Sequence, residues 1–349
     1  ELSKPIKWVS TRPFWRYEQV QQGRFREFYQ TNIDVFGSAA PEADAEVLAV
    51  AADALTDLGL TADDFEFRVS HRDILGGLVR ALAADPDAVD TPAAIRAVDK
   101  RAKVDEGEYL GLLSDAGLSR STAREFDELI AGVETVDDLD AVAAAGGDDV
   151  ADAVANLRNV LAAAADFGAG EYCSVSLTTA RGLDYYTGVV FECFDSTGTV
   201  SRSVFGGGRY DDLIESFGGQ PTPAVGVAPG HATLALLCQR AGVWPEEALS
   251  TDYYVLSVGD TRETAARIAQ DLRAIDDEVV VETDVADRSF GAQLGYADSI
   301  NAETVVIVGE RDLANGEVTV KDMASGAETT APVETFPPAV GRPTYDDFA

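Results

Sequence analysis

Apolar and polar residues alternate along the run GRFREFYQTNIDV, residues 23–35. One parity is apolar and consists of Phe25, Tyr29, Ile33 and Val35. The other parity consists of Arg24, Arg26, Phe28, Gln30, Asn32 and Asp34. Because successive side chains of a strand point to opposite faces, this pattern predicts two strands and a loop over residues 12–36, with the apolar face packed on a core. The second face is a solvated face or a binding face, and its arginines in an acidic chain favour binding.

A helical pattern follows this segment. Over residues 38–60, apolar residues recur at helical spacing, Pro41 suits the first turn, and Gly59 can end the helix. The run FEFRVS, residues 65–70, then predicts a short strand.

The middle of the chain changes character. Residues 80–168 are rich in alanine, aspartate and leucine and poor in strand patterns, which predicts a separate helical insertion. Strand patterns return over residues 171–205. The run PAVGVAPGHATLALLCQR then predicts a strand through Gly226 and Gly230 that leads into a helix.

From about residue 251, strand and helix patterns alternate, which predicts a compact α/β domain of about a hundred residues. Asp260 and Glu263 fit a capping box at the start of the first helix of this domain. The other predicted elements are strands over 252–258, 278–282 and 304–309, a helix over 288–301, and turns between short strands at Asn315-Gly316 and Ser325-Gly326.

The net charge of the chain indicates the salt concentration in which the protein folds. The 349 residues include 61 acidic and 27 basic side chains, which give a formal net charge of -34. A disordered acidic chain would lack apolar residues, whereas 46% of this chain is hydrophobic, so the acidic residues form the surface of a folded protein. Self-repulsion of this size destabilises a compact state unless salt screens it, which points to the salt-rich cytoplasm of an extreme halophile.

Cysteine and histidine are scarce. The three cysteines have no paired spacing, and His71 and His231 are the only histidines, so we expect buried thiols in a reducing compartment and no metal site. No apolar run approaches the ~18 residues of a membrane helix, and no signal peptide is visible, so we expect a cytoplasmic protein without membrane contact. The first residue is Glu1 rather than methionine, which suggests a fragment or a processed product.

The candidate chemistry lies in arginine and glycine residues. Arg16 and Glu18 occur in FWRYEQVQQGR, and Arg181 begins the run RGLDYYTGVVFE. Arginine offers a fork of donors to phosphate and carboxylate, and glycines such as those at 206–208 and Gly226 let a ligand approach the backbone. With no Walker sequence, no G-x-G-x-x-G motif and no Ser-His-Asp set, the residues favour polyphosphate binding on an antiparallel sheet over hydrolysis or redox chemistry.

Plainer structural interpretations exist for several of these residues. Residues 206–208 are compatible with a simple turn, and Arg209 with an ion pair to Asp211 or Asp212. Tyr185 and Tyr186 are compatible with core aromatic residues.

The run RGLDYYTGVVFE resembles the signature of histidyl-tRNA synthetase, a class II aminoacyl-tRNA synthetase. FWRYEQVQQGRFREFYQTNIDVFG is similar to motif 2 of that family, GGGRYDDL to its second signature, and PAVGVAPGHATLALL to its motif 3. FGAQLGYADSINAETVVIVGERDLANGEVTVKDM resembles its anticodon-binding domain. The similarities occur in family order over nearly the whole chain, and the acidic composition suggests a haloarchaeal member.

The resemblance implies an α+β catalytic domain built on an antiparallel sheet, with a helical insertion and a C-terminal α/β anticodon-binding domain. The expected boundaries are 1–79 and 169–245 for the two parts of the catalytic domain, 80–168 for the insertion, and 251–349 for the anticodon-binding domain.

The implied reaction joins histidine to ATP as histidyl-adenylate and then transfers the histidyl group to its tRNA. By resemblance, Arg16 and Arg181 are the catalytic residues and hold the α-phosphate from two sides. Glu18 would bind the adenine amino group, Phe28 would stack on the ring, and Gly226 would line the ATP site. Arg24 and Arg26 would contact phosphates, and Mg²⁺ would accompany ATP.

The same resemblance implies a site for histidine. Gln30 and Asp34 would hold the α-ammonium group, and Arg181 the carboxylate. Tyr186 would hydrogen-bond the imidazole, with Tyr185 beside it. The expected partners are histidine, ATP, histidine tRNA and a second copy of the chain in a homodimer.

Two departures from the family pattern stand out. Motif 3 normally carries an arginine where this chain has Thr233. Either another arginine such as Arg209 or Arg240 takes its role, or ATP binds less well, or this lineage solves the problem in another way. The chain also begins immediately before motif 2, so we expect that an N-terminal segment with motif 1 is missing.

The alternative function is that of a non-catalytic paralogue, the regulatory subunit of ATP phosphoribosyltransferase. Such paralogues lack the anticodon domain.

Overall fold

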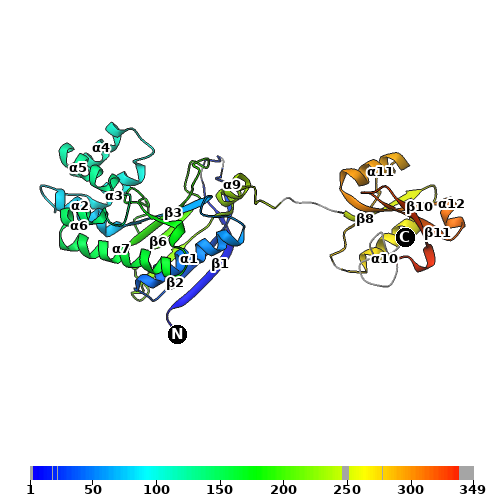
Figure 1. Ribbon diagram of the computed structural model, residues 1–349, viewed down its shortest axis with the longest axis horizontal. Coiled ribbons are helices and arrows are strands. Elements are labelled where there is room, and N and C mark those ends of the chain that lie inside the picture. Colours follow the sequence, from blue (N-terminus) through cyan, green and yellow to red (C-terminus); the bar gives the residue numbers. More distant parts are fainter. Residues whose placement is uncertain (1–2, 18, 22, 246–250, 277, 338–349) are drawn as a thin grey trace. The chain divides into compact units, whose positions relative to one another are not determined.

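The computed structural model describes residues 3–17, 19–21, 23–245, 251–276 and 278–337. The chain divides into two compact units, Glu1–Trp244 and Pro245–Ala349 (Figure 1). In the described ranges, no helix has the length and apolarity needed to cross a membrane.

The first unit is built on a seven-stranded sheet in the order β1-β2-β7-β6-β5-β3-β4. Its strands are β1 (Ile6–Trp15), β2 (Glu27–Phe36), β3 (Phe65–His71), β4 (Cys173–Val175), β5 (Val189–Asp195), β6 (Phe205–Arg209) and β7 (Ala224–Val227). All neighbouring strands are antiparallel except β3 and β4, which are parallel. The predicted antiparallel sheet is therefore confirmed, with one parallel edge pair.

Nine α-helices accompany this sheet in the described part of the unit. They are α1 (Pro41–Asp57), α2 (Arg72–Leu82), α3 (Thr91–Lys100), α4 (Glu106–Asp115), α5 (Arg120–Ala131), α6 (Leu139–Gly146), α7 (Asp148–Asp166), α8 (Leu213–Ser216) and α9 (His231–Ala241), with a 3-10 turn at Gly170–Tyr172. The predicted α1 is confirmed. Pro41 opens it, and Gly59 follows with φ of +89°, a value that favours glycine.

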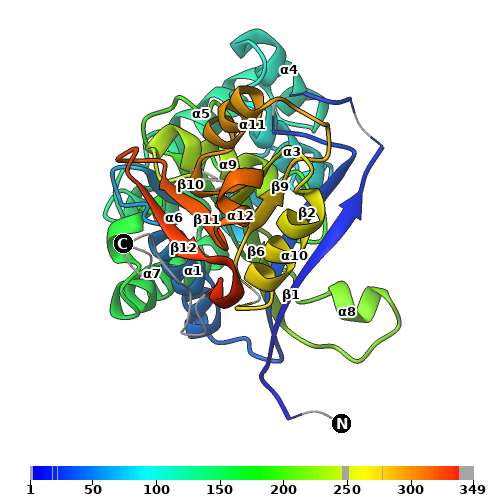
Figure 2. The same cartoon turned by 90° about the vertical axis from the view of Figure 1, so that its right-hand side faces the viewer.

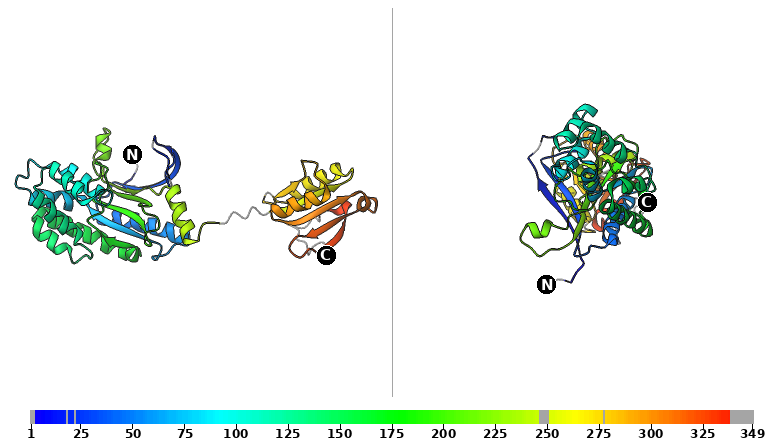
Figure 3. Two further views of the ribbon diagram at one scale, coloured as in Figure 1. Left: turned by 90° about the horizontal axis from the view of Figure 1, so that it is seen from above. Right: turned by 90° about the vertical axis from the view of Figure 1, so that its left-hand side faces the viewer.

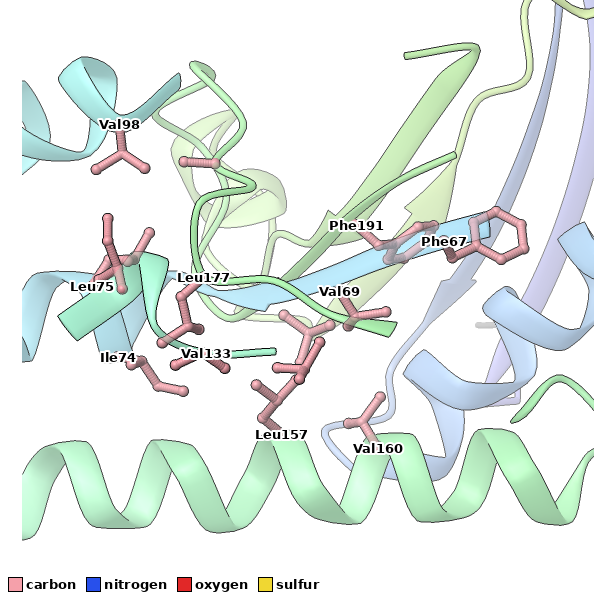
Figure 4. Close-up of a cluster of buried hydrophobic side chains, with 14 of the residues drawn as sticks. Phe67, Val69, Ile74, Leu75, Val98, Val133, Leu157, Val160, Leu177 and Phe191 are labelled. Atoms are coloured by element: carbon pink, nitrogen blue, oxygen red, sulfur yellow. The ribbon is translucent and has the colours of Figure 1, made fainter. Parts of the chain in front are cut away.

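The helices over residues 80–168 and the sheet share one hydrophobic core. Leu157 and Val160 of α7 point toward Val69 and Phe67 of β3 (Figure 4). The predicted helical character of this segment is confirmed, and its side chains belong to the same buried cluster as those of the sheet. The boundaries at residues 80 and 168 stay a prediction.

The hairpin of β1 and β2 stands at the edge of the sheet (Figure 3). Strand β2 begins only at Glu27, so the prediction that Arg24 and Arg26 lie on this strand is wrong, and both belong to the preceding loop. The apolar face is also less buried than predicted, because Tyr29 is 52% exposed whereas Val35 is 4% exposed. The reason is that α1 packs against β2, and the buried residue lies near the Phe36 end of the strand.

The second unit contains a five-stranded sheet in the order β12-β11-β10-β8-β9 (Figure 2). Its elements are β8 (Thr251–Val258), α10 (Arg262–Arg273), β9 (Val281–Thr283), α11 (Phe290–Ser299), β10 (Ala302–Gly309), α12 (Glu310–Ala314), β11 (Glu317–Asp322) and β12 (Glu328–Pro332), with a 3-10 turn at Val333–Thr335. Strand β8 pairs in parallel with β9 and β10, and the remaining pairs are antiparallel. The predicted α/β domain is confirmed.

Alternate residues of β8 face two different cores, as the strand period requires. Tyr253 and Val255 belong to the cluster that contains the apolar face of α10. Tyr254 and Leu256 belong to a second cluster with Ala297 of α11. The two helices therefore cover opposite faces of the sheet.

Three local predictions for this unit need correction. Thr261 rather than Asp260 is the N-terminal cap residue of α10, and the Asp260 amide donates to Glu310 at 2.8 Å, so the predicted capping box does not form. Strand β9 starts at Val281 rather than at residue 278. The turn at Asn315-Gly316 follows the short helix α12, which the pattern did not predict, instead of joining two strands.

Candidate active site

The central strands of the first unit place three backbone positions side by side. Asp34 of β2 lies opposite Gly226 of β7, and Gly226 lies opposite Gly208 of β6. A Cβ atom on Gly226 would lie 2.1 Å from Oδ1 of Asp34 and 2.8 Å from the phenol oxygen of Tyr210. Only glycine therefore leaves room at this position for the polar side chains of both neighbours.

Asp34 and Tyr210 form a polar centre at these positions. The phenol of Tyr210 donates a short hydrogen bond to Oδ1 of Asp34. Burial raises the pKa of the Asp34 carboxyl above its ordinary value, while the bond from Tyr210 works in the opposite direction. Gln30, on the same strand face, donates from Nε2 to the carbonyl of Ala228 at 3.0 Å.

Tyr185 and Tyr186 form a cluster with Tyr210 next to the Asp34 carboxylate. The ring centroids of Tyr185 and Tyr186 lie 4.6 Å apart, and those of Tyr185 and Tyr210 lie 6.2 Å apart. Tyr186 is buried and Tyr185 is 40% exposed. The structure thus brings the predicted Tyr185, Tyr186 and Asp34 together, and Tyr210 connects the tyrosine cluster to the carboxylate.

Arg181 lies next to the same tyrosines. Its Nη1 donates to Oε1 of Glu192 on β5 at 2.8 Å, and its guanidinium carbon lies 5.9 Å from the Tyr186 ring centroid. Burial disfavours the charged form, but the interactions with the Tyr186 phenol and with the Glu192 carboxylate, which also accepts a hydrogen bond, outweigh burial and raise the pKa of Arg181. Arg181 therefore stays cationic, and its buried Nε has no hydrogen-bond partner among the described residues.

Two structural features hold Arg181 in place. The buried Arg72 donates from Nη1 to the carbonyls of Arg181 and Leu183, at 2.8 and 3.1 Å. A Cβ atom on Gly206 would lie 2.6 Å from Nη1 of Arg181. Residues 206–208 are therefore part of strand β6 rather than a simple turn, and Gly206 makes space for the guanidinium.

The loop after β1 carries the other predicted arginines. The guanidinium of Arg16 lies over the ring of Phe28, 4.9 Å from its centroid, and the Arg16 amide donates to the carbonyl of Arg26 at 2.9 Å. Arg26 in turn lies over the ring of Tyr17. Arg24 pairs through its backbone with Gln21. Glu18, the predicted adenine ligand, lies outside the described residues.

The proposed replacements for the motif 3 arginine are both occupied. Arg209 forms a buried ion pair with Asp44 at 2.5 Å and a second ion pair with Asp211 at 3.0 Å. Arg240 pairs with Asp64 at 2.8 Å and with Asp195 at 3.1 Å. These pairs join α1 and α9 to strands of the sheet and engage both guanidinium groups, which disfavours either arginine as the replacement for the missing cation.

Sequence reasoning missed several residues of this site, namely Glu192, Tyr210 and Arg72. Glu192 ends the quoted run RGLDYYTGVVFE, and Tyr210 follows the triple glycine directly. Their proximity to known candidates was a usable signal. Arg72 lies far from both motifs in sequence, and only the folded chain brings it to Arg181.

The described residues contain no group of three histidine, cysteine or acidic side chains arranged to hold a metal ion. The three cysteines are free. Burial raises the pKa of the thiols of Cys193 and Cys173, to about 12 for Cys173, so both remain protonated near neutral pH.

Comparison with known proteins identifies the family. The family model for histidyl-tRNA synthetase matches residues 2–234, and the anticodon binding domain model matches residues 252–342. The chain belongs to the histidyl-tRNA synthetase family, with a catalytic core on a mixed sheet and a C-terminal anticodon-binding domain.

The relatives are consistent with this assignment. The chain is 85% identical over 350 aligned residues to the histidine–tRNA ligase of Halorubrum lacusprofundi, covering 100% of this chain and 79% of that protein. It is 70% identical to that of Haloarcula marismortui, covering 100% of this chain and 79% of that protein. The crystal structure of histidyl-tRNA synthetase from Nostoc has the same fold, with a TM-score of 0.72 and 24% identity over 96% of this chain and 77% of that one. The haloarchaeal relatives agree with the acidic composition, and the anticodon-binding match disfavours the regulatory-subunit alternative.

Proposed function

We propose that the chain is a histidine–tRNA ligase that works through histidyl-adenylate. The observation that carries this proposal is the half-buried Arg181, held by Arg72 and Glu192 against Tyr186. The curated relatives above are named for the same activity.

In the first step, a carboxylate oxygen of histidine attacks the α-phosphorus of ATP, and pyrophosphate leaves with the electrons of the broken P–O bond. Negative charge gathers on the non-bridging α-phosphate oxygens during this displacement. Arg181 neutralises that charge and holds the histidine carboxylate, while Arg16 meets the α-phosphate from the loop after β1. Fixed positive charge and positioning provide the catalysis, since no proton has to be moved in this step.

Specificity for histidine comes from the Asp34 and tyrosine cluster. The α-ammonium group of the substrate is held by the Asp34 carboxylate and by the side-chain oxygen of Gln30. Tyr186, with Tyr185 beside it, hydrogen-bonds the imidazole. A site that pairs its buried polar groups with one substrate rejects analogues that leave those groups unpaired.

In this proposal, ATP binds on the same face of the sheet as histidine, toward the loop after β1. Phe28, already covered by Arg16, stacks on the adenine ring, and Glu18 binds its amino group. Gly226 lets the nucleotide approach the backbone, and Arg24 and Arg26 meet the phosphates. Mg²⁺ would accompany the phosphates of ATP and neutralise part of their charge, and the Glu192 carboxylate, which contacts Arg181, would be a candidate ligand for it.

In the second step, a terminal ribose hydroxyl of the tRNA attacks the carbonyl carbon of histidyl-adenylate. The bond from that carbon to the phosphate oxygen breaks, AMP leaves with its electrons, and the hydroxyl proton passes to the leaving phosphate or to water. The second unit, which matches the anticodon-binding family, recognises the tRNA at its anticodon. This division assigns chemistry to the first unit and tRNA selection to the second.

We also propose a cytoplasmic homodimer. The β1–β2 hairpin exposes large apolar side chains, with Trp8 at 53%, Val9 at 66% and Trp15 at 69%. An exposed apolar surface of this kind is typical of an interface between chains. Light scattering in molar KCl should give twice the mass of one chain, and a monomer mass would contradict the dimer.

Charging of histidine tRNA with labelled histidine in molar KCl tests the proposed function directly. The Halorubrum lacusprofundi ligase serves as positive control, and a tRNA with another anticodon as negative control. We expect histidyl-tRNA from this chain and none with the other tRNA. Charging by the control ligase without charging by this chain would contradict the proposal.

A further inference from the structure

Thr233 occupies the position of the motif 3 arginine, and its side chain contacts neighbouring segments of the chain. Its hydroxyl donates a short hydrogen bond to the carbonyl of Val204. Its methyl group lies 3.0 Å from the position that a Cβ atom on Gly23 would occupy. Thr233 therefore joins α9 to the segment before β6 and to the loop after β1, and it offers no cation to a nucleotide.

Arg202 lies in that same segment, two residues before Val204. Its Nη2 donates to Oε1 of Gln21 at 3.0 Å, so it reaches the loop after β1. Gln21 exchanges two backbone hydrogen bonds with Arg24, at 2.8 and 3.2 Å. Arg202 is thus connected to the loop that carries the predicted phosphate ligands.

A second connection leads from Arg202 to Arg181. Ser203, the neighbour of Arg202, donates from its hydroxyl to Oε1 of Glu192 at 3.0 Å. The same carboxylate oxygen accepts the bond from Nη1 of Arg181 at 2.8 Å. The segment that carries Arg202 is therefore fixed between Arg181 on one side and the loop with Arg24 on the other.

The guanidinium of Arg202 has an unused donor. Its Nη1 is buried and has no hydrogen-bond partner among the described residues. The chain has 61 acidic residues, yet none in its described part forms an ion pair with Arg202. A buried, unpaired donor on a cation is costly, and an anionic ligand is the partner that would satisfy it.

We infer that Arg202 binds the β- and γ-phosphates of ATP and so replaces the cation that Thr233 does not supply. This inference rests on the proposed function. Arg16 and Arg181 are assigned to the α-phosphate, and Arg202, tethered between the Arg181 cluster and the Arg24 loop, meets the part of the triphosphate that leaves as pyrophosphate. Arginine suits this role because its planar fork matches phosphate oxygens.

The test compares Arg202→Gln and Arg202→Lys with Gln21→Ala in histidine-dependent ATP–pyrophosphate exchange in molar KCl. ATP and pyrophosphate both carry the two phosphates, whereas AMP and histidine do not. We expect Arg202→Gln to raise the KM for ATP and for pyrophosphate about 10- to 100-fold, with the KM for histidine and the inhibition constant of AMP within about two-fold of wild type. Arg202→Lys should recover part of the loss, because it keeps the charge without the fork.

Gln21→Ala separates binding from structure, because it removes the link to the loop and keeps the cation. We expect it to leave the KM for pyrophosphate within about two-fold. The inference is overturned if Gln21→Ala reproduces the effect of Arg202→Gln, if AMP binding weakens equally, or if Arg202→Gln leaves the KM for pyrophosphate unchanged.

Calorimetric titration of inorganic pyrophosphate into the wild type and Arg202→Gln makes the test independent of turnover. Absence of exchange in the wild type would contradict the proposed function alone. Weaker pyrophosphate binding by Arg202→Gln would support the phosphate assignment even then, and equal binding would overturn it.

Discussion

Tyr210, immediately after β6, donates its phenol hydrogen bond to Oδ1 of Asp34 on β2, and the space between them exists because residue 226 of the intervening β7 is a glycine. Two strands that are not neighbours in the sheet thus cooperate to orient one half-buried carboxylate. The carboxylate that holds the substrate ammonium group in our proposal therefore depends on the phenol of Tyr210 and on Gly226, neither of which contacts histidine in that proposal.

Replacing Tyr210 by phenylalanine should shift the pH dependence of histidine use. Burial raises the pKa of Asp34, and the bond from Tyr210 lowers it, so its loss raises the pKa further. Histidine binding needs the ionised carboxylate and is lost as the pH falls through this pKa. We therefore expect the acid limb of kcat/KM for histidine to move to higher pH in Tyr210→Phe. Tyr172→Phe, beside the opposite edge strand β4, is the control, and an unmoved limb in Tyr210→Phe would refute the coupling.

Replacing Gly226 by alanine should weaken histidine binding, because the new Cβ atom would lie 2.1 Å from Oδ1 of Asp34. Overpacking of this kind costs about 1–3 kcal/mol, and here the displaced group is the substrate ligand, so we expect the KM for histidine to rise about ten-fold or more. Gly230→Ala is the matched control, because its Cβ atom would have no neighbour within 4 Å among the described residues. Equal KM values for the two variants would show that Asp34 is not displaced.

Breaking the buried ion pair of Arg209 and Asp44 should destabilise the first unit. These side chains are 9% and 1% exposed, and removing one partner of such a pair typically costs about 3–5 kcal/mol. We expect Asp44→Asn to lower the urea midpoint of the first unit in molar KCl accordingly. Asp140→Asn is the control. It removes the ion pair between Arg158 and the Asp140 carboxylate, which is 78% exposed, and should lower the free energy of unfolding by less than about 1 kcal/mol. Similar losses for both variants would mean that burial does not set the strength of the pair.

Binding of tRNA should depend only weakly on salt. With 27 basic side chains against 61 acidic ones, the chain can neutralise few phosphates, and counterion release sets the salt slope. We expect a plot of log K against log [KCl] for histidine tRNA to have a shallow slope, with recognition resting on local arginines and base contacts. The measurement is a filter-binding titration between about 0.5 and 3 M KCl, within the range where screening acts over a few ångströms. A slope near -10, the steepness of a strongly phosphate-binding protein, would contradict this expectation.

The sequence predicted the elements whose pattern depends on local burial. The α1 helix, β3 and the alternation of strands and helices after residue 251 follow from apolar spacing, and the structure has all of them. The edge hairpin was predicted less well, because period two distinguishes the faces of a strand but not whether another layer covers them. Tyr29 shares its parity with Val35, yet the two differ in exposure by more than ten-fold, at 52% and 4%.

The site was predictable where its residues fall within one motif. Arg181, Tyr185 and Tyr186 are adjacent in sequence and remain together in the structure. Arg72 and Asp44 lie more than a hundred residues from Arg181 and Arg209, the residues they contact, and no local pattern records such pairs. The sequence indicated the ion pair of Arg209 with the nearby Asp211, but the distant partners Asp44 of Arg209 and Asp64 of Arg240 become visible only in the fold.

Histidine-dependent ATP–pyrophosphate exchange in molar KCl, measured for the wild type and for Arg181→Ala, tests the central claim most directly. Arg68→Ala, which removes another arginine–glutamate pair of the same sheet, is the control. Arg181 is assigned to the charge that develops on the α-phosphate, so we expect its loss to lower exchange about 10²- to 10³-fold, while Arg68→Ala exchanges like the wild type. Exchange that proceeds without histidine, or that survives Arg181→Ala unchanged, would contradict the claim that this arginine makes histidyl-adenylate.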